Sequence, residues 1–227
     1  PTLGECLSRA PTTASKAAFA DALARIGSSE AVDELVARLN AENDPAVRAV
    51  LAQAFDAVSA SDAVETLTSA LAVIDDPVVS ARVVSAVARA ANGDTVAFLR
   101  ELYEEPSTVP GQPTAALTAL ATIRNPEATA ALAGLAHDAG DARLMEAAAR
   151  GLGSIGTPEA LDGIARGLRH VGDTHRELRE AMLDSIALVA NHEALPWLDV
   201  AARFSDDSGL ANAAAHAAAT MRQDAAP

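Results

Sequence analysis

An internal repeat of 32 to 34 residues runs through almost the whole of this 227-residue chain. One apolar position at the end of a helical pattern marks each unit. Nine residues after this marker stands leucine or isoleucine, five residues after it a small residue, and eighteen residues after it aspartate or threonine. The markers are Ile26, Val58, Ala90, Ile123, Ile155, Val189 and Met221. The column nine residues after the marker consists of Leu35, Leu67, Leu99, Leu132, Ile164 and Leu198. The column five residues after it consists of Ala31, Ala63, Thr95, Ala128, Ala160 and Ala194. The column eighteen residues after it consists of Asp44, Asp76, Thr108, Asp141, Asp173 and Asp207.

Each unit is predicted to form two helices. The first begins at the aspartate column, because Asp44 is a good N-cap and Pro45 suits the first helical position. The second begins just after the marker, as in Gly156-Thr157-Pro158-Glu159. A carboxylate recurs at this second start and favours the positive end of the helix dipole, so we interpret this column as capping, not catalysis. It consists of Glu30, Asp62, Asp94, Glu127, Glu159 and Glu193.

The composition supports a helical fold with a thin core. Half of the residues are apolar but only 3% are aromatic, and alanine, the best helix former, is abundant. Helical hairpins of this kind cannot bury their apolar faces alone and must stack. We therefore predict an all-α fold, a right-handed α-α superhelix (solenoid) of about six to seven helical-hairpin repeats.

The repeat predicts one solenoid over residues 1–227. Both ends fall within a unit, so we expect either single-helix caps or a domain excised from a longer protein. The predicted parts are a partial repeat at 1–13, repeats at about 14–43, 44–75, 76–107, 108–140, 141–172 and 173–206, and a half repeat at 207–227.

Two segments depart from the period. Glu105 to Pro113 contains three prolines and a glycine, which predicts a loop where a helix would otherwise start. Asp173 to Arg176 accommodates two extra residues, which predicts a longer turn.

The units resemble the short HEAT-like repeat of the phycobilisome-lyase type. The matching stretches are Leu23-Ala24-Arg25-Ile26-Gly27, Asp44-Pro45-Ala46-Val47-Arg48 and Leu152-Gly153-Ser154-Ile155-Gly156-Thr157-Pro158-Glu159-Ala160-Leu161. The resemblance implies the solenoid fold. It also implies an alternative function, a phycobilin lyase-like protein that binds a tetrapyrrole and acts on phycobiliprotein subunits.

Charge and residue content exclude several classes. A net charge of −14 opposes binding to a phosphate backbone, and with it a HEAT-like DNA glycosylase. The single cysteine, Cys6, excludes an internal disulfide, and no apolar run is long enough to span a membrane, so we expect a cytoplasmic protein. His192-Glu193 resembles the His-Glu pairs of the HEAT-like deoxyhypusine hydroxylases. The same columns hold Ser29-Glu30, Ser61-Asp62 and Pro126-Glu127, so we predict no metal, no cofactor and no catalytic residues.

The second helices are expected to line the concave face of such an array, so their outward columns are candidates for binding. A helical wheel places acidic residues there in the first three full units and basic residues in the last three, with Asp162 as the exception. The predicted groove is therefore acidic at one end and basic at the other, although an ordinary solvated face gives the same pattern. The candidates are Asp33, Glu65, Glu101, Glu104, His137, Arg166, Arg169 and Arg203.

Two aromatic residues, Phe98 and Trp197, share one column at the edge of the core face. They either pack between adjacent units or contact a ligand. From the sequence we predict a non-enzymatic scaffold or adaptor that binds a protein or peptide on its concave face, and no nucleic acid or membrane. If the protein is an enzyme, the resemblance implies a lyase of the bilin-attaching type.

Overall fold

The computed structural model of the chain describes residues 9–10, 12–90, 94–104, 109–138, 140–171 and 175–224. In these residues the regular structure is entirely helical, with no strand, which confirms the predicted all-α fold of helical hairpins. The chain divides into two compact units, one up to Ala119 and one from Leu120.

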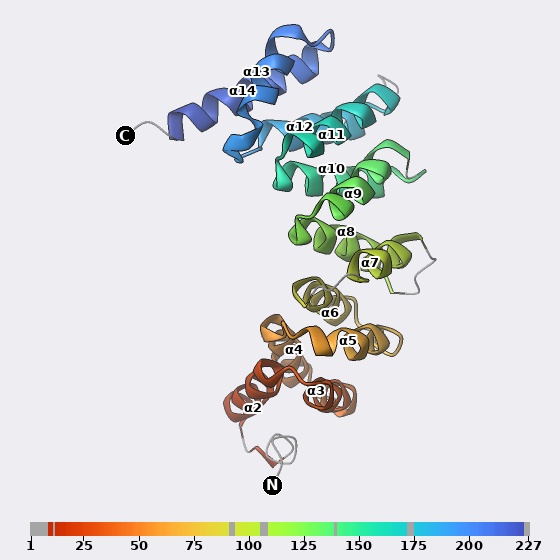
Figure 1. The fold of residues 1–227 in the computed structure, drawn as a ribbon. Helices are drawn as coiled ribbons and strands as arrows, with labels where there is room; N and C mark the ends of the chain where they lie inside the picture. The colour runs from red at the N-terminus through yellow and green to blue at the C-terminus, as the bar shows by residue number, and fades with distance from the viewer. Residues whose placement is uncertain are drawn as a thin grey trace. The chain divides into compact units, whose positions relative to one another are not determined.

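The N-terminal unit contains three predicted hairpins (Figure 1). The first helices of these hairpins neighbour one another, and so do the second helices α3 and α5. The hairpins are α2 (Thr13–Ile26) with α3 (Ser29–Ala41), α4 (Pro45–Ala54) with α5 (Val64–Leu71), and α6 (Pro77–Arg89) with α7 (Thr95–Glu104). Helix α8 (Gln112–Ile123) begins in this unit.

The C-terminal unit has two layers of helices (Figure 1). One layer holds the first helices α10 (Ala142–Ile155), α12 (Arg176–Ala187) and α14 (Ser208–Asp224). The other holds the second helices α9 (Pro126–Asp138), α11 (Pro158–Val171) and α13 (Leu195–Phe204). We call the second group the second-helix layer.

The predicted apolar columns form the core. All six residues of the column nine after the marker, from Leu35 to Leu198, are fully buried. The small-residue column, from Ala31 to Ala194, is also buried throughout. Both predictions from the repeat are confirmed.

The predicted caps are confirmed at several helix starts. The Asp44 carboxylate accepts a hydrogen bond from the Ala46 N–H at 2.8 Å, and Asp76 and Asp141 cap α6 and α10 in the same way. The Asp207 carboxylate accepts from the Leu210 N–H at 3.1 Å. Although partial burial raises the pKa of Asp207, this N–H and the Arg179 guanidinium together hold it below its ordinary value. The Thr108 and Asp173 positions lie outside the described residues.

Two helix boundaries differ from the prediction. The first helix of the second hairpin was expected to reach Val58, but α4 ends at Ala54 and a 3₁₀ turn covers Phe55–Ala57. The Phe55 carbonyl accepts from the Val58 N–H within this turn at 3.1 Å and also from the Arg89 side chain of α6 at 2.8 Å, which ties α6 to the end of the helix. The predicted loop up to Pro113 ends sooner, because α8 starts at Gln112. Pro113 fits there since the first turn of a helix needs no backbone donor.

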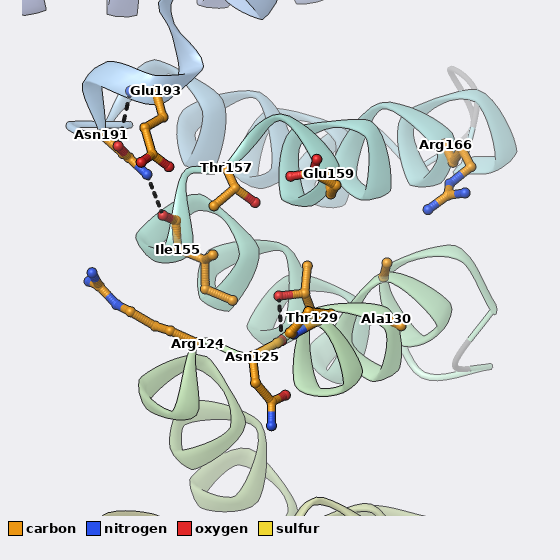
Figure 2. A pocket seen from close by; sticks show the side chains of 12 residues that line it. Arg124, Asn125, Thr129, Ala130, Ile155, Thr157, Glu159, Arg166, Asn191 and Glu193 are labelled. Carbon is orange, nitrogen blue, oxygen red and sulfur yellow. Dashed lines mark hydrogen bonds between the residues drawn. The ribbon is translucent and has the colours of Figure 1, made fainter.

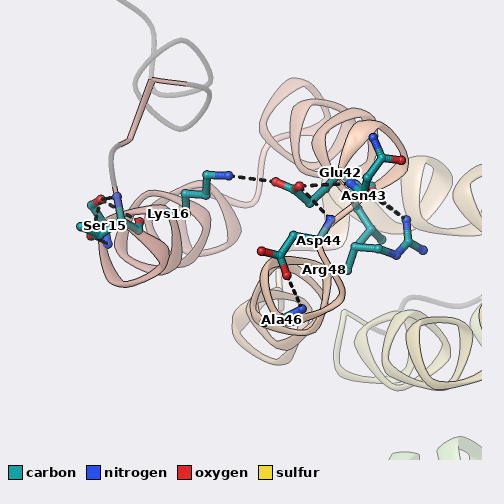
Figure 3. A network of polar contacts seen from close by, with 9 residues as sticks. Ser15, Lys16, Glu42, Asn43, Asp44, Ala46 and Arg48 are labelled. Atoms are coloured by element: carbon teal, nitrogen blue, oxygen red, sulfur yellow. Dashed lines mark hydrogen bonds and ion pairs between the residues drawn. The ribbon is translucent and has the colours of Figure 1, made fainter.

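A carboxylate fixes the turn between α3 and α4 (Figure 3). Glu42 accepts a hydrogen bond from Lys16 of α2 at 2.9 Å and from the Asp44 N–H at 3.1 Å, and these contacts lower its pKa. Arg48 donates to the Leu39 carbonyl at 2.9 Å and so closes the end of α3. The network joins the first hairpin to the second.

Neighbouring hairpins of the C-terminal unit approach closely at glycines. A Cβ atom at Gly153 of α10 would collide with the Ser185 carbonyl oxygen of α12, and one at Gly167 of α11 with the Ala136 carbonyl oxygen of α9. One at Gly163 would lie 2.8 Å from the Ala133 Cβ atom. These glycines let the helices stack without an intervening side chain.

Replacing Gly167 by alanine should lower the free energy of unfolding by about 1–3 kcal/mol, because the new methyl group forces α11 away from α9. The matched control is Gly134→Ala, also within a helix of this layer, where an added Cβ meets nothing within 4 Å. That change should raise stability by about 0.5–1 kcal/mol through helix propensity alone. Urea unfolding followed by circular dichroism measures both, and equal effects of the two changes would contradict the packing role of Gly167.

Candidate partner-binding face

The predicted acidic candidates all lie exposed on second helices of the N-terminal unit. Asp33 is on α3, Glu65 on α5, and Glu101 and Glu104 are on α7. Glu104 forms an ion pair with Arg100 at 3.6 Å. No hydrogen bond or ion pair joins these four residues to one another, so the structure places them on one kind of helix without gathering them into a cluster.

The predicted basic candidates lie exposed in the second-helix layer of the C-terminal unit. His137 is in the last turn of α9, Arg166 and Arg169 are on α11, and Arg203 is in the last turn of α13. The structure brings His137 against His170 of α11, with ring centroids 4.7 Å apart and planes at 87°. The sequence columns did not identify His170 as a candidate.

Charge also varies along the helices of this layer. Glu127 and Glu159 stand in the first turns of α9 and α11, and Glu193 in the 3₁₀ turn before α13, whereas the basic residues gather towards the last turns. This arrangement complements the helix dipoles, which accounts for part of the basic character. Arg166 stands outside the last turn and needs another explanation. The predicted gradient from an acidic to a basic end involves residues of both units and stays a prediction.

Trp197 joins α13 to α11. Its side chain is half-buried, and the indole Nε1 donates a hydrogen bond of 2.7 Å to Asp162 Oδ1. Of the two interpretations of this aromatic column, this geometry favours packing between adjacent hairpins. Phe98 is half-buried on α7 of the other unit.

A cavity of about 680 Å³ opens between α9 and α11 on the second-helix layer (Figure 2). Three of the polar residues that line it are already engaged as helix caps. Asn125 accepts from the Ala128 N–H at 2.7 Å, Thr157 from the Ala160 N–H at 3.3 Å, and Asn191 from the Glu193 N–H at 3.1 Å. Their side chains therefore hold the wall of the cavity in place.

Two arginines stand at opposite ends of this cavity, Arg124 and Arg166 (Figure 2). Arg124 has a φ of 50°, a left-handed conformation that costs a non-glycine residue about 1 kcal/mol or more. Gly27 and Gly156 occupy the same place in their repeats with φ of 64° and 63°. Arg124 was not among the residues predicted from the sequence, and the signal that could have identified it is an arginine in a column where two other units, at Gly27 and Gly156, have glycine.

Other kinds of site find little support in the described part of the chain. No group of three or more His, Cys, Asp or Glu side chains there could hold a metal ion. His192 and Glu193 are exposed in the 3₁₀ turn His192–Ala194 that precedes α13. None of the described helices combines the length and apolar character needed to cross a membrane. Cys6 lies outside the described residues.

The chain belongs to the HEAT-repeat proteins, because the profile of HEAT repeats matches residues 1–88 and 113–173, more than half of its length. No curated protein matches the chain with significant similarity.

Solved structures that resemble it include human deoxyhypusine hydroxylase in complex with glycerol, with 20% identity over 97% of this chain and 83% of that chain and a TM-score of 0.42. The complex of CpcE and CpcF of phycocyanin lyase from Nostoc sp. PCC7120 has 16% identity over 97% of this chain and 95% of that chain and a TM-score of 0.32. Similarity at this level carries no argument about activity.

The contact between Trp197 and Asp162 should be measurable as a coupling energy. In a double-mutant cycle with Trp197→Phe and Asp162→Ala, we expect a coupling of about 0.5–1.5 kcal/mol in the free energy of unfolding, since each change alone removes the same hydrogen bond. Urea unfolding of the four proteins gives this value. Additive effects would show that the two side chains do not interact in solution.

Proposed function

We propose that this chain is a non-enzymatic HEAT-repeat scaffold that binds a protein or peptide on its second helices. The observation that carries the proposal is the cavity between α9 and α11. Its cap residues Asn125, Thr157 and Asn191 are used for structure, while the charged side chains of Glu159, Arg166 and Glu193 in its lining make no ion pair or hydrogen bond among the described residues. A surface built this way offers shape and charge for recognition. Stacked helical repeats commonly present such extended surfaces to partners.

A photo-crosslinking experiment tests which layer meets the partner. A benzoylphenylalanine side chain would be placed at Ala130 or His170 in the second-helix layer and, as matched controls, at Arg150 or Ser154 of α10; all four positions are exposed. After irradiation in lysate of the source organism, we expect discrete polypeptide adducts from the first two positions only. Adducts from α10 alone, or equally from both layers, would contradict the proposal.

The same proteins separate the scaffold from the alternative implied by the phycobilisome-lyase resemblance. A tetrapyrrole-binding protein would shift and sharpen the visible absorbance of added phycocyanobilin. We expect no such shift, and the shift together with an absence of polypeptide adducts would replace the scaffold by the tetrapyrrole-binding function.

A further inference from the structure

We propose that the C-terminal unit binds an acidic polypeptide segment in which carboxylates are interspersed with apolar side chains. The surface, which we call the basic face, consists of Gly134 of α9, Arg166 and Arg169 of α11, and Val200, Arg203 and Phe204 of α13. The inference rests on the proposed function and names the class of partner.

Arg166 and Arg203 are unpaired because their natural partners are engaged elsewhere. Acidic residues four positions before Arg25, Arg38 and Arg150 pair with those arginines on the same helix. Asp162 stands in the same relation to Arg166, but its Oδ1 atom accepts the Trp197 indole N–H instead.

The carboxylate of Asp199 is also engaged by a residue other than the arginine four positions after it. Asp199 stands four positions before Arg203, but both of its oxygens accept from Arg222 Nη2 of α14. Arg169 has no acidic residue four positions before it. In the described part of the chain, none of the three arginines of the basic face makes an ion pair or a side-chain hydrogen bond.

Most other basic residues of the protein do have such partners. Besides the pairs within helices, Arg82, Arg179 and Arg222 pair with carboxylates of other helices, and Arg48 and Arg89 donate to backbone carbonyls. Arg124 also donates to a backbone carbonyl, that of Ser154. Arg9 and Arg143 are the remaining arginines whose side chains make no ion pair or hydrogen bond among the described residues, and Arg143 lies on the first helix α10. In a chain with a net charge of −14, unpaired arginines gathered on one face mark an attractive surface for carboxylates.

Apolar side chains lie beside Arg203. Val200 and Phe204 are 59% and 77% exposed, and as residues i and i+4 of α13 they share a face that Arg203, at i+3, borders. The Asn191–Ile155 and Trp197–Asp162 hydrogen bonds show that α11 and α13 run in the same direction. Arg169 lies two turns after Asp162 on α11, and Phe204 lies two turns after Trp197 on α13. An occupant that meets both must offer acidic and apolar groups together.

Gly134 indicates where a partner can come close. It lies in the middle of α9, where glycine costs about 1 kcal/mol relative to alanine, and among the described residues no atom beyond its own helix backbone and chain neighbours lies within 4 Å of the place of its Cβ. Gly153, Gly163 and Gly167 are instead required by close internal contacts. Gly134 shares a helix face with Ala130, which lines the cavity with Arg166, and with His137. The structure leaves this place open for a backbone that comes from outside the chain.

The direct test uses fluorescence anisotropy of the whole chain with three short fluorescein-labelled peptides, in which glutamate alternates with leucine, glutamate with serine, and lysine with leucine. We expect the glutamate–leucine peptide to bind about ten-fold more tightly than either other peptide. Reversing Arg166, Arg169 and Arg203 together to glutamate should weaken its binding about 100-fold, because three attractions become repulsions. Gly134→Leu should also weaken it.

A second variant tests whether the pairing of Asp199 with Arg222 keeps Arg203 unpaired, and it changes no residue of the basic face. Arg222→Gln releases Asp199, which can then neutralise Arg203, so glutamate–leucine binding should fall by about two- to five-fold. Arg150→Gln is the matched control: it removes the same charge from a paired arginine of the first-helix layer and should leave binding unchanged.

Several results would overturn the inference. Unchanged binding in the triple reversal, equal effects of Arg222→Gln and Arg150→Gln, or equal binding of the three peptides would each do so. Binding of a poly-uridine oligonucleotide as tight as that of the glutamate–leucine peptide would reassign the face to nucleic acid. Polypeptide crosslinks to Ala130 or His170 without peptide binding would refute this inference alone and leave the scaffold function intact.

Discussion

Close approach between neighbouring hairpins is the constraint on which the other features of the C-terminal unit depend. At Gly153 and Gly167 the backbone of one hairpin meets the carbonyl oxygen of the next with no side chain between them. A hairpin of this size cannot bury its apolar face alone, so such contacts create the core and also fix the register of each helix against the next. That register determines where the exposed side chains of α9 and α11 lie relative to one another.

The pairing of carboxylates explains how an acidic protein can present a basic surface. Many carboxylates are engaged by groups close in sequence, either as helix caps such as Asp44 and Asp141 or in ion pairs with arginines four residues away. Between the hairpins, Trp197 and Arg222 engage Asp162 and Asp199. The net charge of −14 therefore describes the chain as a whole, whereas the second-helix layer of the C-terminal unit keeps its arginines free.

The repeat made much of the fold predictable from the sequence. Columns such as Leu35 to Leu198 and caps such as Asp76 depend on local spacing, and the structure confirms them. Less of the candidate site could be predicted from the sequence. A helical wheel predicted that Arg166 and Arg203 are exposed. That they are also unpaired depends on the hydrogen bonds of Asp162 and Asp199, and each of these carboxylates bonds to a residue more than twenty positions away. The left-handed Arg124 and the ring contact of His170 depend in the same way on tertiary placement.

The central claim, that the second-helix layer of the C-terminal unit is the binding surface, is tested most directly by amide hydrogen exchange with and without saturating glutamate–leucine peptide. Backbone protection reports where the ligand lies independently of any substitution. The account predicts slower exchange in the last turns of α9, α11 and α13, with α10, α12 and α14 unchanged. Protection confined to α10, α12 and α14, or no protection at saturation, would contradict it.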